Sequence, residues 1–206
     1  MATTTFNGPV RSENGFQMVS KNATTGAITV TSGDKMAVEA TASAGIEGTA
    51  AVYVTQVNRL KSDVTTNVNI VKTSIMIDLT GLKDGGTAGD IIGKDGDGVA
   101  FIGQVTAANQ GTVFGVTMQC VETPAGGSTD IDLFSATEGT GVNDTAIGDL
   151  TETQIINAGA ASAGSLVAGG DIAADQFLYL VSQGTGDATY TAGRFLIEIL
   201  GFDAAS

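Results

Sequence analysis

The stretch IVKTSIMIDLTGL, residues 70–82, alternates large apolar residues with more polar ones. Its two interleaved sets are Val71, Thr73, Ile75, Ile77 and Leu79 on one side, and Lys72, Ser74, Met76 and Asp78 on the other. Because successive side chains of a β-strand point to opposite faces of a sheet, this period of two predicts a strand that is buried on one face only. A half-buried strand needs a sheet around it, and the chain offers further candidates.

Similar segments follow at short intervals, separated by turns rich in glycine. They are GVAFIGQV, VFGVTMQCV, TDIDLFSA, DQFLYLVSQ and GRFLIEILGF. In VFGVTMQCV, Phe114, Val116, Met118 and Cys120 alternate with smaller or polar residues, whereas DQFLYLVSQ is apolar on both faces, which is typical of a strand covered on both sides. Many short strands joined by Gly-rich turns predict an all-β fold, an antiparallel β-sandwich or a barrel.

Helix signals are nearly absent, in keeping with 29 glycines and many Thr and Val residues. YVTQVNRLKSDV, residues 53–64, places apolar residues near a helical period, but its β-branched content favours two strands joined at KSD. NDTAIGDLTETQIINA, residues 143–158, is expected to form one or two helical turns at most. AANQGT is expected to be a turn between two strands.

The compact sandwich is expected at residues 66–206. Residues 1–65 are expected to form an extended N-terminal arm with short strands, such as GAITVTS (26–32) and GTAAVYVT (48–55). EATASAGIEGT (39–49) between these strands predicts a flexible connector. The composition leaves open whether the two parts share a core.

The arm opens with FNGPVRSENGFQ, residues 6–17, in which two Asn-Gly pairs predict tight turns. A terminus is usually the loosest part of a domain, but this one carries turn-forming residues and two aromatic rings. We expect the turns to hold the arm in a fixed shape that presents a set of residues to a partner: Phe6, Pro9, Val10, Arg11 and Phe16. The rival interpretation is that the two rings cover the core of the domain itself.

Charge is scarce and unevenly placed. Only 15% of residues are charged, and the net charge of −13 falls entirely within residues 95–206, because residues 1–94 hold eight acids and eight bases. Nucleic acid is not an expected partner, since phosphates are bound by Lys and Arg. Few charges suit a subunit of an assembly, whose contacts would lose stability by burying them.

The closing strand GRFLIEILGF points Phe195, Ile197 and Ile199 inward and leaves large apolar residues on its other face. These outer residues are Leu196, Leu200 and Phe202. An apolar solvent face is unusual for a strand, so we expect a subunit contact there. With the low charge, this face predicts self-association as a homotrimer.

Catalytic residues are not predicted. The chain has no histidine, which removes the commonest general base and the Ser-His-Asp and Cys-His arrangements. Its single cysteine, Cys120, is expected to be buried and inert. Asp130 and Asp132 lie at i and i+2 on one strand, whereas glycosidases place two carboxyl groups across a substrate from different elements.

No cofactor or metal is predicted. GGTAGDIIGKDGDG, residues 85–98, resembles the start of a calcium-binding loop through Asp95 and Asp97, but the later Glu ligand and the flanking helices of an EF-hand are missing. The preferred interpretation is a hairpin turn between DIIG and VAFIG. A signal peptide and a membrane-spanning apolar run are also not apparent, so no membrane partner is expected.

Several stretches resemble virion proteins of tailed bacteriophages, particularly marine ones. They are FNGPVRSENGF, IDLTGLKDGG, GDIIG, FIGQVT, MQCVETPAGGSTDIDLFSATEGTG and YTAGRFLIEILGF, and the larger part of the resemblance covers roughly the last two thirds of the chain. The chain is similar in style to the small β-sandwich proteins that decorate or cement icosahedral heads. The major capsid protein itself fits poorly, because its fold needs a long spine helix.

This resemblance implies a jelly-roll, usually trimeric and non-enzymatic, that binds the outer surface of the capsid and fastens neighbouring major capsid subunits. Such a protein is made in the host cytoplasm and ends on the virion. The alternative is a receptor- or glycan-binding knob of a tail or head fibre, which is also often a trimeric jelly-roll. A fibre should show a heptad shaft or a Gly-X-Y stalk, and neither is present.

Overall fold

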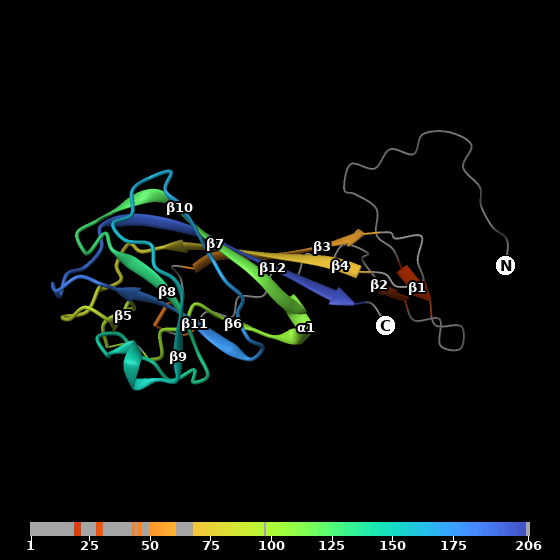
Figure 1. Ribbon diagram of the computed structural model, residues 1–206, viewed down its shortest axis with the longest axis horizontal. Helices are drawn as coiled ribbons and strands as arrows, with labels where there is room; N and C mark the ends of the chain where they lie inside the picture. The colour runs from red at the N-terminus through yellow and green to blue at the C-terminus, as the bar shows by residue number, and fades with distance from the viewer. Residues whose placement is uncertain are drawn as a thin grey trace. The chain divides into compact units, whose positions relative to one another are not determined.

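The described part of the chain is almost entirely β-structure. The computed structural model (Figure 1) describes residues 19–21, 28–30, 43, 45–46, 50–60, 68–96 and 98–204. Strand accounts for 51% and helix for 5%, which confirms the all-β prediction. No helix among these residues is long and apolar enough to cross a membrane.

The chain divides into two compact units, residues 1–35 and 36–206. In the first unit, β1 (Val19–Lys21) pairs antiparallel with β2 (Ile28–Val30). β2 lies within the predicted strand GAITVTS.

The second unit is a sandwich of two antiparallel sheets. The first sheet has the strand order β10-β7-β12-β4-β3, and the second has the order β5-β11-β8-β9, with β6 also paired to β11. The strands are β3 (Ala50–Leu60), β4 (Val68–Asp78), β5 (Asp90–Ile91), β6 (Gly103–Val105), β7 (Thr112–Ala125), β8 (Ile131–Ala136), β9 (Glu152–Ile156), β10 (Leu166–Gly169), β11 (Gln176–Ser182) and β12 (Ala192–Ala204).

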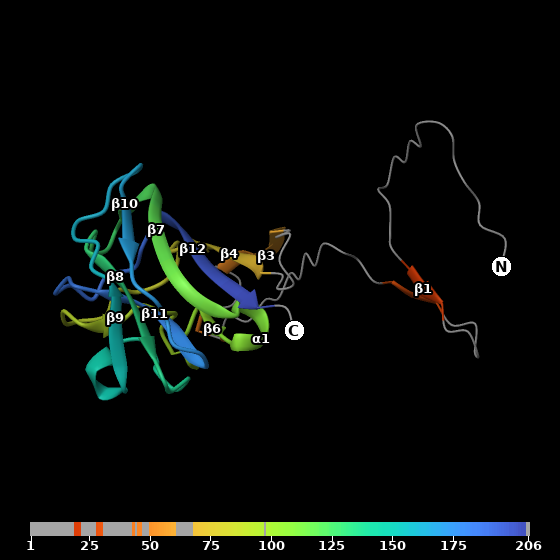
Figure 2. The same cartoon turned by 45° about the vertical axis from the view of Figure 1, so that its right-hand side comes forward.

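The pairing follows a simple rule along the chain. β4 pairs with β12, β5 and β6 with β11, β7 with β10, and β8 with β9, so the strands from β4 onward form one long antiparallel ribbon closed between β8 and β9. Rolled into two layers (Figure 2), such a ribbon is a jelly roll. The predicted jelly-roll-like sandwich is therefore confirmed.

The core lies between the two sheets. The inward residues of β4 and the following Leu79 are at most 4% exposed, and Phe195, Ile197 and Ile199 of β12 are at most 1% exposed. The register places Phe195 opposite Ile77 and Ile197 opposite Ile75, so the two predicted apolar faces form one layer of the core. The period-two interpretation of both strands is confirmed.

In the second sheet, β8 and most of β11 are buried on both faces, whereas β9 is largely exposed. Leu178, Tyr179, Leu180 and Val181 of β11 are at most 1% exposed, as expected for a strand that is apolar on both faces. The Tyr179 hydroxyl donates a 2.7 Å hydrogen bond to the carbonyl oxygen of Glu138 and accepts one from the N–H of Gly141. The loop after β8 is thereby fixed to this sheet.

The segment predicted as a flexible connector is held in place at its described residues. The N–H of Ser43 donates to the carbonyl oxygen of Phe101 at 3.1 Å, the N–H of Gly45 donates to that of Val99 at 2.8 Å, and Ile46 is 1% exposed. β3 also pairs with β4 from Ala50 to Leu60, which places it in the sheet of the sandwich although it precedes residue 66. The strand interpretation of YVTQVNRLKSDV is confirmed through Leu60, and the KSD junction lies outside the described residues.

In the part of the chain that the structure describes, helical structure is confined to short turns. AANQGT contains α1 (Ala107–Gln110), a four-residue helix in which the Thr106 hydroxyl accepts a hydrogen bond from the N–H of Asn109. Gly111 ends it at φ +67°. The 3-10 turn η1 (Ile147–Asp149) and β9 share the segment 143–158, so the expectation of little helix there is confirmed.

Candidate assembly surface

The first sheet carries exposed apolar side chains on the side that points away from the second sheet. We call the side of the first sheet that points away from the second sheet the outer face. Several large apolar side chains on this face are exposed to solvent: Phe114 by 50%, Leu166 by 58% and Phe202 by 38%. Leu196 and Leu200 are half-buried on the same face. Exposed apolar side chains gathered on one face are typical of a contact surface.

Strand register explains how these residues gather. Leu166 of β10 lies opposite Gln119 of β7, and Gln119 lies opposite Leu196 of β12. Leu196 in turn lies opposite Met76 of β4. Directly opposed residues of antiparallel strands share a face of the sheet, so one row across four strands is apolar except at Gln119.

Phe114 and Phe202 form a second cluster, which we call the phenylalanine pair. Their ring centroids are 6.3 Å apart, with 37° between the ring planes. A register shift between β12 and β7 pairs Leu200 with Gly115 but Gly201 with Val113, so Phe114 is the extra residue of a β-bulge. A bulge turns a side chain to the other face, which is why Val113 is 5% exposed and Phe114 is 50% exposed.

The charges on this face are paired with one another. Lys72 forms an ion pair with Glu198, between the two apolar clusters. Arg194 Nε lies 3.0 Å from Asp78 Oδ2. Burial raises the pKa of the Asp78 carboxyl, but hydrogen bonds from Thr80 and Arg194 outweigh it, and the pKa lies below its usual value of 3.8. Apolar clusters beside satisfied charges resemble the composition of a protein–protein interface.

Of the predicted contact residues, Leu196, Leu200 and Phe202 all lie on the outer face. Phe6, Pro9, Val10, Arg11 and Phe16 lie outside the described residues. Sequence reasoning missed Phe114, because its alternation with Val116 predicted an inward side chain. It also missed Leu166, which stands in a segment of small residues without a clear period.

Of the two carboxylates at the start of β8, Asp132 has structural partners, whereas Asp130 has a buried Oδ1 without a hydrogen-bond partner among the described residues. Asp132 is 1% exposed, and its two oxygens accept hydrogen bonds from the N–H of Ala158 and from Gln154 Nε2, both at 2.8 Å. Burial and the charge of Asp132 raise the pKa of the Asp130 carboxyl. Because its two oxygens bind β9 and the segment after it, Asp132 acts as a brace between strands.

The loop 85–98 contains the predicted turn but not the predicted hairpin. Gly96 adopts φ +75° in a turn, while Gly93 bridges to Lys83 and Val99 bridges to Val142, so the two flanking segments pair elsewhere. Asp95 Oδ2 lies 3.0 Å from Lys83 Nζ. Asp97 lies outside the described residues. Among the described side chains, no group of three or more His, Cys, Asp or Glu could hold a metal ion.

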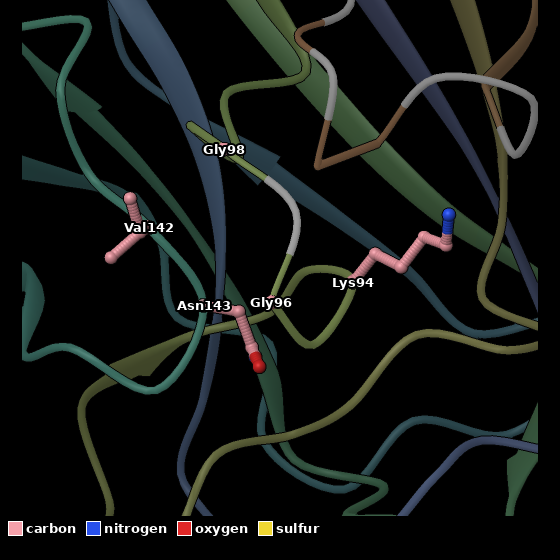
Figure 3. A pocket seen from close by; sticks show the side chains of 5 residues that line it. All are labelled: Lys94, Gly96, Gly98, Val142 and Asn143. Atoms are coloured by element: carbon pink, nitrogen blue, oxygen red, sulfur yellow. The ribbon is translucent and has the colours of Figure 1, made fainter.

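A small pocket lies beside this loop (Figure 3). It has a volume of about 240 Å³ and is lined by Lys94, Gly96, Gly98, Val142 and Asn143. The Asn143 amide donates hydrogen bonds to the carbonyl oxygens of Lys83 and Ile91, so it holds two loop segments together. The pocket is smaller than typical ligand sites, and none of its described lining residues is aromatic.

Cys120 is buried as predicted. It is 1% exposed, its Sγ donates to the carbonyl oxygen of Glu122 at 3.2 Å, and burial raises the pKa of its thiol. A raised thiol pKa lowers the share of the reactive thiolate.

Comparison with protein-family models, curated proteins and solved structures gives no match for this chain.

Proposed function

We propose that this protein is a non-enzymatic virion protein that decorates an icosahedral phage head. It binds the outer surface of the capsid and stabilises contacts between major capsid subunits. The observation that carries this proposal is the outer face, where exposed apolar clusters stand beside charges that are paired with one another. The resemblance of the sequence to phage decoration proteins supplies the class of partner.

The fold is compatible with this role and does not by itself select it. Jelly rolls occur in viral capsid proteins and in lectins, so the argument depends on the surface. A lectin needs a hollow with polar groups and, commonly, aromatic rings. The pocket beside the loop 85–98 offers the polar groups of Lys94 and Asn143, but its volume of about 240 Å³ is small and none of its described lining residues is aromatic, which favours decoration over glycan binding.

The charge is divided along the sequence and not between faces, because β3 and β4 come from the neutral part while β7, β10 and β12 of the same sheet come from the acidic part. Residues 1–94 are neutral overall, while residues 95–206 carry the whole net charge of −13. The net negative charge favours solubility of the free protein, and the ion pairs on the outer face limit the electrostatic cost of approaching a partner there. The localisation implied is the outside of the virion, after synthesis in the host cytoplasm.

The test is sedimentation with empty heads assembled from the major capsid protein of the same genome. We expect the purified protein to sediment with the heads, to saturate at a fixed ratio to the capsid subunit, and to raise the temperature at which the heads dissociate. If it stays in the supernatant at micromolar concentration, or binds without saturation, the proposal is wrong.

Self-association belongs to the same proposal. A decoration protein gains affinity when several weak contacts bind as one unit. The homotrimer expected from the sequence stays a prediction, and analytical ultracentrifugation of the free and head-bound protein measures it.

A further inference from the structure

β3 is the longest edge strand of the sandwich. It spans 11 residues at one end of the first sheet, whereas the other terminal strands, β10, β5 and β9, span four, two and five. Within the described residues, β4 is the only strand paired with β3. In an antiparallel ladder every second residue directs its N–H and C=O away from its partner, so about half of the β3 residues direct backbone groups to this edge, where no other described strand pairs with them.

This edge has few of the features that prevent strands from pairing. Its sequence AAVYVTQVNRL contains no proline or glycine, and Arg59 is its one charged residue. Its bulge lies at the start, between Ala50 and Val52, and the register to β4 then runs without a shift to Leu60. Native proteins usually protect long edges with charges, proline or central bulges. A regular edge without them is suited to pairing with another strand.

The sequence of β3 is complementary to itself in one antiparallel register. With Thr55 opposite Thr55 of a second copy, Tyr53 falls opposite Val57, and Val54 falls opposite Gln56. Thr–Thr and aromatic–β-branched pairs are favourable across antiparallel strands. Arg59 falls opposite Ala51, so the single charge of β3 does not meet its own copy.

Charge favours a second copy at this edge. β3 belongs to the neutral part of the sequence, residues 1–94, while the acidic part would repel an identical molecule. Pairing of a strand with its own copy creates a twofold contact, which closes after two molecules and leaves no free β3 edge. Such a contact covers the edge without building a fibre.

We propose that two copies of this protein pair through β3, antiparallel and centred on Thr55. The first sheet of each copy, which has five strands, then joins that of the other copy in one continuous sheet of ten strands. This contact goes beyond the proposed function and does not depend on capsid binding. A threefold ring is not formed by it, because a twofold contact cannot bind a third copy.

The register is tested by cysteine cross-linking of the full-length protein. Thr55→Cys places two thiols in directly opposed positions, where Cα atoms of antiparallel strands are about 4.5–5.5 Å apart, within the range of a disulfide. The matched control is Gln56→Cys, whose two copies lie diagonally, about 7–8 Å apart. Cys120 is buried, so the unsubstituted protein serves as the background.

We expect mild oxidation to convert most of the Thr55→Cys protein to a covalent dimer while Gln56→Cys stays largely uncoupled. Equal cross-linking of the two variants means random collision, and no cross-linking of either means that this edge does not pair with itself. Both results overturn the proposal. Circular dichroism of both variants confirms that the sheet is intact.

A charge exchange tests the same register without a covalent bond. Val54→Lys/Gln56→Lys brings two lysine pairs face to face across the twofold axis, whereas Val54→Lys/Gln56→Glu brings lysine opposite glutamate twice. By sedimentation equilibrium, we expect the first variant to dissociate at roughly tenfold or more lower affinity than the second. Equal affinities, or a trimer that neither variant disturbs, would show that the copies meet elsewhere. Binding to empty heads, measured separately, distinguishes this outcome from failure of the proposed function.

Discussion

Truncation of the phenylalanine pair, Phe114→Ala/Phe202→Ala, is expected to weaken binding to empty heads strongly while leaving the fold intact. A phenylalanine side chain covers about 200 Å². With exposed fractions of 50% and 38%, the two rings present about 100 and about 75 Å² of apolar surface to a partner. At about 25 cal/mol per Å², their complete burial contributes at most about 4 kcal/mol.

Part of this free energy is offset by ordering of side chains and by residual contacts of the alanines. We therefore expect the binding free energy to weaken by about 2–3 kcal/mol, which is a roughly 30- to 150-fold lower affinity per binding unit. The free energy of unfolding should fall by less than the binding free energy, because both rings are already in contact with water in the free protein. The assay is sedimentation over a range of protein concentrations, with thermal unfolding measured in parallel.

Val142→Ala is the matched control. Val142 is exposed by 36%, yet it lines the small pocket on a loop remote from the outer face in sequence and pairing. We expect its affinity to be unchanged. If the phenylalanine double variant binds within threefold of the unsubstituted protein, or if Val142→Ala weakens binding equally, the outer face is not the contact surface.

Three further predictions concern stability and the arm. Gly201→Ala should destabilise the protein by about 1–3 kcal/mol in denaturant unfolding, because a Cβ there would overlap the backbone oxygen of Gln110. In the control Gly115→Ala the new Cβ meets nothing within 4 Å, so the loss of stability should be far smaller. Equal losses of stability in the two variants would refute the packing argument. Since the folded-state pKa of Asp78 lies below 3.8, the contribution of its carboxylate to stability is present above that pH and is lost as the pH falls through the folded-state pKa. Asp78→Asn should therefore flatten the fall in melting temperature below about pH 4. An unchanged dependence of melting temperature on pH would contradict this. Deletion of residues 1–17 should abolish head binding at an unchanged melting temperature if the arm is a docking element; unfolding would assign the arm to the core, and undiminished binding would end the docking hypothesis.

The strands that could be predicted from sequence are those with a strict period of two or a continuous apolar run. β4 and β12 have one face against the core and one outward, so their alternation is visible residue by residue. The outward placement of Leu196, Leu200 and Phe202 follows from the same alternation. The ring of Phe114 escaped prediction because its direction depends on a register shift against β12, and no local pattern in β7 encodes that shift.

Other features depend on contacts distant in sequence. Ser43 and Ile46 stand in a stretch of small residues typical of a flexible segment, yet Ser43 pairs with Phe101, 58 residues away. The Asp-Gly turn at residues 95–96 was predicted from composition, but its flanking segments pair with Lys83 and Val142 instead of with each other. Turn chemistry indicates where the chain reverses and does not identify the partner of each strand.

Cryo-electron microscopy of the native phage particle tests the central proposal most directly. We predict density for the jelly roll on the outside of the head, bridging neighbouring capsid subunits, with the face formed by β10, β7, β12 and β4 and the phenylalanine pair against the shell. Density in which this face points to solvent, or a particle whose head lacks the protein, would contradict the proposal.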